Sequence, residues 1–160
     1  HLASAYASLL NGGTKIKPTL LRRSTPQNGP RVIRKEISAQ ARDMLRQVVL
    51  RGTASFGDVE GYNVGGKTGT ADKPKENGGG YYDNKTISTF ASVFPTNDPK
   101  YILIVTFDEP SENSGIEPRR TAGWTAVPVA AEMIRRTAPL LGLRPQVDTS
   151  SAISVTLTSN

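Results

Sequence analysis

The sequence predicts an α+β fold in which an antiparallel sheet packs against helices. Two apolar runs, residues 86–94 and 101–107, are joined by a short segment of Pro, Thr, Asn and Asp, a pattern typical of a β-hairpin. Apolar residues recur at helical spacing over residues 38–52 and again over residues 122–138. With 160 residues, of which 36% are hydrophobic, the chain can bury one modest core.

Two helices are expected before the sheet. The first ends at the Asn11-Gly12-Gly13 segment, because glycine favours a helix C-terminus, and one of its faces carries Leu2, Tyr6, Leu9 and Leu10. The second begins with Ser38 as its N-cap and ends at Gly52. Its apolar residues follow the i, i+3, i+4, i+7, i+8 pattern of one helix face: Ala41, Met44, Leu45, Val48 and Val49.

The second half of the chain supplies the hairpin and a last helix. Residues 73–85 are polar and rich in glycine, which indicates a loop. Residues 101–107 are almost all large and apolar, so this strand is expected inside the sheet with both faces covered. In the helix over residues 122–138, Pro128 is tolerated only in the first turn or at a kink. The face of this helix that packs across the sheet carries Val127, Ala130, Ala131 and Ile134.

Two motifs overlap in the middle of the chain. Residues 61–68 fit G-x-x-x-x-G-K-[ST], the loop that cradles nucleotide phosphates, while residues 67–70 spell K-T-G-T, found in the active-site strand of penicillin-recognising serine enzymes. A phosphate loop needs a buried strand before it and a helix after it. Residues 51–60 contain no apolar run, and the residues after Lys67 include the helix breakers Gly69, Pro74 and Gly78-Gly79-Gly80. The flanks therefore favour a short strand over residues 67–71, whose central glycine indicates close approach by another group.

Composition limits the chemistry that the chain can perform. Cysteine is absent and the single histidine is His1, which excludes disulfides, thiolate catalysis, cysteine metal sites and a His-based triad. Serine, threonine, lysine or carboxylate chemistry remains, with no cofactor or metal expected. The net charge of +6 comes from scattered basic residues without interleaved aromatics, so it indicates a solvated surface and no nucleic-acid partner. No apolar run is long enough to cross a bilayer.

Several ordered segments resemble the transpeptidase domain of class B penicillin-binding proteins, most closely the septal peptidoglycan D,D-transpeptidases. The resemblance covers residues 1–143 and implies part of the penicillin-binding transpeptidase fold, which is related to serine β-lactamases. Residues 144–160 form a C-terminal tail outside it. The segments that resemble helices before the active-site strand are Leu2-Ala3-Ser4-Ala5-Tyr6-Ala7, Asn11-Gly12-Gly13 and Arg51-Gly52-Thr53-Ala54, and those that resemble three strands are residues 63–71, 88–95 and 104–110.

The resemblance implies specific roles in acyl transfer from a D-Ala-D-Ala stem peptide. Lys67 supplies positive charge and helps to hold the terminal carboxylate, and Thr68 adds a hydroxyl hydrogen bond. Gly69 leaves room for the substrate backbone. Thr70 offers its amide to the oxyanion and its carbonyl to the substrate amide, as in strand addition to a sheet edge. The same resemblance implies β-lactam binding, divisome or elongation partners, and a place on the bacterial periplasmic face of the inner membrane in cell-wall synthesis and division.

The chain departs from this family at the nucleophile. No serine is followed three residues later by lysine, so the S-x-x-K motif is missing. Ser111-Glu112-Asn113 spells the family's S-x-N motif but follows the K-T-G strand in a turn-like stretch, so we interpret it as a chance match. The chain is therefore expected to be the C-terminal half of a transpeptidase domain, inactive by itself. The alternatives are a non-catalytic interaction module of the same fold and a nucleotide-binding protein.

The remaining candidates concern the surface and the tail. Arg119 and Arg120 are favoured as surface charges over contacts to an anionic substrate group, and Trp124 as a packing residue. In the resembled fold the strand over residues 101–107 pairs on its far side with a strand from the preceding half of the domain. Here it would be an exposed edge, which invites another strand. Residues 152–158 alternate apolar and hydroxyl side chains, so this tail or a second copy of the chain is expected to cover that edge.

Overall fold

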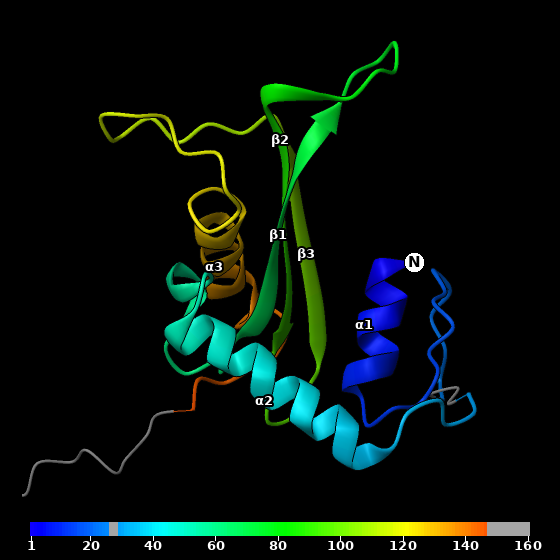
Figure 1. Ribbon diagram of the computed structural model, residues 1–160. Helices are drawn as coiled ribbons and strands as arrows, with labels where there is room; N and C mark the ends of the chain where they lie inside the picture. The colour runs from blue at the N-terminus through cyan, green and yellow to red at the C-terminus, as the bar shows by residue number, and fades with distance from the viewer. Residues whose placement is uncertain (26–28, 147–160) are drawn as a thin grey trace, which may run out of the picture.

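The computed structural model describes residues 1–25 and 29–146. Three strands form one antiparallel sheet in the order β1-β2-β3. Helix α3 packs against one face of the sheet, α1 lies on the other side near β3, and α2 crosses close to β1 (Figure 1). In chain order the elements are α1 Leu2–Leu10, α2 Lys35–Arg51, the 3-10 turn η1 Ser55–Gly57, β1 Gly65–Pro74, β2 Tyr81–Phe94, β3 Tyr101–Asp108 and α3 Ala126–Thr137.

The register of the sheet confirms the predicted strand at the overlapping motifs. Lys67 lies opposite Ala91 and Thr70 opposite Ser88, so β1 pairs with β2 throughout the motif. Strands β2 and β3 form the expected antiparallel hairpin. A helix beginning at Lys67 does not exist, and the phosphate-loop interpretation is therefore wrong.

The core lies mainly between the sheet and α3. Phe90 at the centre of β2 is fully buried and belongs to one cluster with Val105 of β3 and Val127 of α3. A second cluster toward the other end of α3 contains Val64, Phe94 and Ile134. These contacts confirm the predicted face of the last helix, since its four predicted residues are all buried: Val127, Ala130, Ala131 and Ile134.

The start of α2 differs from the prediction. The helix begins at Lys35, and Ser38 lies within it, fully buried. Its hydroxyl oxygen accepts hydrogen bonds from the amide of Gly12, at 3.0 Å, and from the Arg42 side chain, at 3.3 Å. Ser38 therefore joins α2 to the end of α1, a tertiary role that resembles an N-cap in sequence because the same hydroxyl accepts a backbone N–H in both. Of the predicted apolar face, Met44 is exposed.

The last helix begins at Ala126, four residues later than predicted. Residues 121–125 form turns in which the amides of Trp124 and Thr125 donate to the carbonyl of Thr121. Starting at Ala126 places Pro128 at the third helical position, where its missing N–H breaks no hydrogen bond of the helix. Of the two places expected to tolerate Pro128, the first turn or a kink, the structure shows the first turn.

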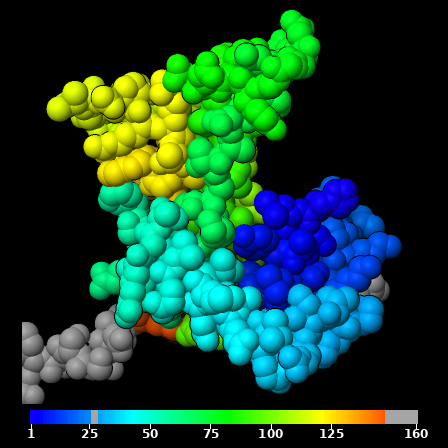
Figure 2. Space-filling view, viewed as in Figure 1, coloured from blue at the N-terminus to red at the C-terminus, as the bar shows by residue number. Residues whose placement is uncertain are grey.

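The loop predicted over residues 73–85 is mostly strand. Strand β1 continues to Pro74 and β2 begins at Tyr81, which leaves only residues 75–80 as the turn. Figure 2 shows this β1–β2 turn projecting beyond the body of the molecule. The two strand ends beside this turn, residues 71–74 and 81–85, are largely exposed on both faces. They therefore carry no apolar alternation from which strands could have been predicted.

Strand β3 is an edge strand of the described sheet, which corrects the expectation that residues 101–107 lie inside the sheet. One side of β3 packs through Leu103 and Phe107 toward α3. The expectation of a free edge agrees with this order of strands.

The strand predicted over residues 152–158 lies outside the described residues, and the boundary at residue 143 stays a prediction. Residues just past that boundary contact the domain, because the amide of Gln146 donates to the carbonyl of Gly61 at 2.8 Å.

No helix within residues 1–25 and 29–146 is long and apolar enough to cross a membrane.

Candidate functional site

Strand β1 holds the K-T-G-T residues at an edge of the sheet. Gly66, just before the motif, packs directly on the core, because a Cβ there would lie 2.5 Å from two ring atoms of Phe90. Alternation along a strand places Thr68 and Thr70 on the same face as Gly66, and Lys67 and Gly69 on the opposite face. The buried ring of Phe90 therefore fixes which motif residues point toward α3 and η1.

Thr68 and Thr70 line one open cavity of about 340 Å³ beside β1. The opposite wall comes from the turn before α3 and from the segment just after α2, and it consists of Thr53, Thr121, Gly123 and Trp124. Four of the six lining residues are threonines. The cavity therefore presents hydroxyl groups next to one aromatic ring, which suits a ligand with a polar, hydrogen-bond-accepting end.

The two threonine hydroxyls of β1 each have a partner behind them. The amide of Ala122 donates to Oγ1 of Thr70 at 3.0 Å. Oγ1 of Thr68 lies 2.7 Å from Oγ1 of Thr53, and either oxygen can be the donor. A threonine hydroxyl carries one proton and two acceptor positions. Because Thr70 already accepts from Ala122, its own proton is free to be donated into the cavity.

Lys67 does not line this cavity. Its Nζ donates to the carbonyl oxygen of Thr68 at 2.8 Å, so the ammonium lies against the backbone of its own strand. The side chain is exposed. The structure thus brings Thr68 and Thr70 together, with Gly69 between them on the strand, and leaves Lys67 on the other face with its charge turned back along the motif.

Trp124 bounds the cavity and is held by two neighbours. The Arg119 guanidinium lies 3.8 Å from the centre of the Trp124 ring, and the ring of Phe56 lies 5.0 Å away. Stacking of this kind occupies Arg119 within the protein.

Ser111 lines a separate cavity on the far side of Trp124 and donates to Oδ1 of Asn113 at 2.7 Å. The S-x-N residues are thus bonded to one another within their own turn.

A charged cluster ties the three strands together beyond the motif. Nζ of Lys73 on β1 lies 2.9 Å from Asp108 of β3 and 2.8 Å from Glu109, which Lys85 of β2 also contacts at 3.1 Å. These hydrogen bonds raise the pKa of Lys73 and lower that of Glu109. The cluster is partly exposed and links side chains from all three strands at this end of the sheet. Among the described residues, no three His, Asp or Glu side chains gather as a metal site.

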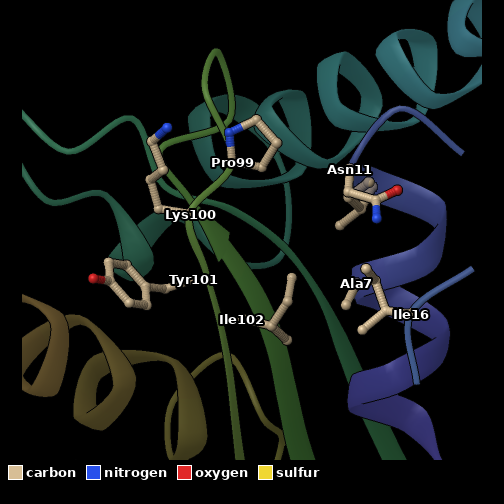
Figure 3. A pocket seen from close by; sticks show the side chains of 8 residues that line it. Ala7, Asn11, Ile16, Pro99, Lys100, Tyr101 and Ile102 are labelled. Atoms are coloured by element: carbon tan, nitrogen blue, oxygen red, sulfur yellow. The ribbon is translucent and has the colours of Figure 1, made fainter. Parts of the chain in front are cut away.

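A second cavity, of about 240 Å³, lies between α1 and the start of β3. Figure 3 shows Ile102 on the side of β3 that faces Ala7 and Ile16, while the ring of Tyr101 points away from them. The lining is mostly apolar and brings no set of polar side chains together. It therefore offers no chemistry comparable with that of the hydroxyl cavity.

Sequence reasoning found the motif strand but missed the opposite wall of its cavity. Thr53 belongs to a segment that carried the family resemblance, yet nothing in the sequence indicated that its hydroxyl would reach Thr68. Ala122 contributes only its backbone amide, which no side-chain pattern can reveal. Trp124 was expected to serve packing, and its contacts with Arg119 and Phe56 fit that expectation although the ring also lines the cavity.

Comparison with known proteins gives a consistent set of relatives. Residues 1–134 match the family model described as the penicillin binding protein transpeptidase domain. The chain is 36% identical over 157 residues to a probable peptidoglycan D,D-transpeptidase FtsI of Caulobacter vibrioides, covering 92% of the chain and 26% of that protein. It is 33% identical over 155 residues to stage V sporulation protein D of Bacillus subtilis, covering 89% of the chain and 23% of that protein. The chain spans about a quarter of the length of these relatives.

Solved structures show the same fold. The apo transpeptidase domain of penicillin-binding protein 3 from Burkholderia pseudomallei superposes with a TM-score of 0.73 at 30% identity, covering 91% of this chain and 43% of that one. Penicillin-binding protein 3 from Mycobacterium tuberculosis, complexed with ampicillin, superposes with a TM-score of 0.74 at 24% identity, covering 93% of this chain and 36% of that one. The mixed fold of helices and antiparallel sheet is therefore that of these domains.

Proposed function

The chain belongs to the penicillin binding protein transpeptidase family, and from this premise we propose that it is the K-T-G-bearing part of a septal-type peptidoglycan D,D-transpeptidase. Such an enzyme cross-links stem peptides by serine acyl transfer and is acylated by penicillin. The observation that carries the proposal is the placement of K-T-G-T on an edge strand, with two of its hydroxyls lining one open cavity.

The motif residues have complementary roles in this proposal. The hydroxyls of Thr68 and Thr70 donate to the carboxylate at the end of a D-Ala-D-Ala stem peptide, and Lys67 adds positive charge near the same strand. Gly69 lets the ligand backbone approach β1. The amide of Thr70 donates to the oxyanion and its carbonyl accepts from the ligand amide, so the ligand adds to the edge as a short strand.

The nucleophile must come from outside these residues. Acyl transfer needs an activated serine, and no S-x-x-K motif occurs among the 160 residues. The isolated chain therefore supplies binding groups without the group that forms the acyl bond. No cofactor takes part in this chemistry.

Labelling with a fluorescent penicillin tests the proposal. The complete protein that contains this segment is expected to form a covalent adduct, and the isolated 160-residue chain to form none. A complete protein that binds stem peptide but takes no label would favour the non-catalytic interaction module of the same fold. Stoichiometric labelling of the isolated chain would contradict the division of the site proposed here.

The cellular setting follows from the same proposal. The complete enzyme acts at the periplasmic face of the bacterial inner membrane, where its substrate is made available, and meets divisome or elongation proteins there. Fractionation of cells that express the complete protein tests the location, and its recovery in the cytosol would contradict it.

The edge of β3 gives the isolated chain a route to self-association. Its backbone groups on the side away from β2 have no strand partner within the described sheet, and free edges of this kind pair with other strands. We therefore propose a homo-oligomer of the isolated chain through β3. Size-exclusion chromatography with light scattering is expected to show dimers that dissociate on dilution, and a strict monomer at high concentration would contradict this.

A further inference from the structure

Thr53 lies in the cavity wall opposite the motif strand, just after the chain leaves α2. Its Oγ1 lies 2.7 Å from Oγ1 of Thr68. Its carbonyl oxygen lies against Gly123, where a Cβ would be only 2.7 Å away. The backbone on either side is also fixed, because the amide of Ala54 donates to Val48 and Ala54 is fully buried. Thr53 is thus held in place by its neighbours although its own side chain is exposed.

The number of hydroxyl protons decides what the Thr53–Thr68 pair can do. Two hydroxyls that share one hydrogen bond use one proton between them and leave one. If Thr68 donates to Thr53, the remaining proton lies on Thr53, at the opposite wall of the cavity, and the Thr68 hydroxyl offers none. If Thr53 donates to Thr68, the proton of Thr68 is free, as the proton of Thr70 is because Ala122 donates to that oxygen.

The second arrangement turns both hydroxyls of β1 into donors toward the same cavity. Residues two apart on a strand are separated by about 7 Å, a span that one carboxylate can bridge with one oxygen toward each hydroxyl. A carboxylate accepts hydrogen bonds and donates none. An anionic ligand therefore favours the state in which Thr53 donates.

We propose that Thr53 is a positioning residue for carboxylate recognition: it donates its proton to Thr68 and so directs the Thr68 hydroxyl toward the ligand. The proposal rests on the proposed function, since it assigns a role within the same site. Thr53 also lines the cavity, and in this assignment it acts through Thr68. It does for Thr68 what the Ala122 amide does for Thr70.

The test uses the complete protein and two penicillins that differ only at the carboxylate, the free acid and its methyl ester. Thr53→Val keeps the shape of the side chain and removes the hydroxyl, whereas Thr53→Ser keeps the hydroxyl. The second-order rate constant for acylation by the free acid is expected to fall about tenfold in Thr53→Val, the loss expected when a charge-assisted hydrogen bond is weakened. The rate constant for the ester should change less than about twofold, and Thr53→Ser should behave as the wild type does.

Each outcome decides the matter. Equal losses for acid and ester would show a structural role and overturn the proposal, as would no loss for either ligand. Failure of the wild-type protein to react with either penicillin would overturn the proposed function itself, which separates the two conclusions. Because the Thr53 side chain is exposed, Thr53→Val is expected to fold. If Thr53→Val does not fold, Thr53→Ala gives the same comparison of acid with ester.

Discussion

Replacing Gly66 by alanine is expected to destabilise the chain through clashes with Phe90 and with the backbone of β2. The new Cβ would lie 2.5 Å from Cε2 and Cζ of that ring and 2.8 Å from the carbonyl oxygen of Ala91. Carbon atoms in contact lie about 3.5–4.0 Å apart, so the ring must move by about 1 Å. Phe90 is fully buried and packs in the same cluster as Val105 and Val127, which leaves it no free space.

The magnitude follows from the cost of overpacking a core. Extra methyl groups in a filled core destabilise by about 1–3 kcal/mol, and the second clash, with backbone of β2, places this substitution at the upper end. For a chain of this size, each 1 kcal/mol shifts the melting temperature by about 2–4 °C. Gly66→Ala should therefore lower the melting temperature of the isolated chain by about 6–12 °C.

Gly69→Ala is the matched control on the same strand. A Cβ at Gly69 would meet nothing closer than 4.0 Å, at Thr89, so the free energy of unfolding should change by less than about 0.5 kcal/mol. In the complete protein the same substitution should slow acylation by penicillin, because the methyl group occupies the path of the ligand backbone. Thermal unfolding of the two variants checks the reasoning, and equal stability of Gly66→Ala and Gly69→Ala would refute it.

Four further substitutions test other residues of the site and the fold. In the complete protein, Lys67→Ala should lower the second-order rate constant for acylation by penicillin about 100-fold, because it removes charge near the reacting groups. Arg119→Ala should lower the same constant less than about threefold. Equal effects of the two substitutions would contradict the roles given. Ser38→Ala should destabilise the isolated chain by about 1–3 kcal/mol in urea unfolding, since it leaves a loop amide without its acceptor, and an unchanged midpoint would count against that bond. The lowered pKa of Glu109 means that its pairing with Lys73 stabilises the fold above the unfolded pKa and is lost as pH falls through the folded pKa. Glu109→Gln should therefore lower the melting temperature at pH 7 and low salt, with a difference from wild type that shrinks on acidification, and a difference independent of pH would argue against the ion pair.

Sequence reasoning succeeded where one local pattern decided the structure. The helical spacing of apolar residues placed Val127 and Ile134 on the buried face of α3, and the breakers after Lys67 excluded a helix there. It failed where partners distant in sequence decide what a side chain bonds to. Ser38 looks like an N-cap because its hydroxyl accepts an N–H, but the N–H belongs to Gly12, 26 residues away.

The candidate site divides in the same way. The motif, together with the ordered segments that resemble the family around it, pointed to Lys67, Thr68, Gly69 and Thr70, and their roles stay predictions. The wall opposite them depends on where the end of α2 and the turn before α3 meet β1. That meeting is a property of tertiary packing, so neither the hydroxyl behind Thr68 nor the amide behind Thr70 carries a signal in the sequence.

A crystal structure of the complete protein acylated by penicillin tests the central claim most directly. We expect the ligand to lie along the free edge of β1, with its carboxylate within about 2.5–3.2 Å of the hydroxyls of Thr68 and Thr70. We also expect the acyl bond to join the ligand to a serine outside the 160 residues of this sequence. A ligand bound in the apolar cavity between α1 and β3, or one attached to a serine of this chain, would contradict the central claim.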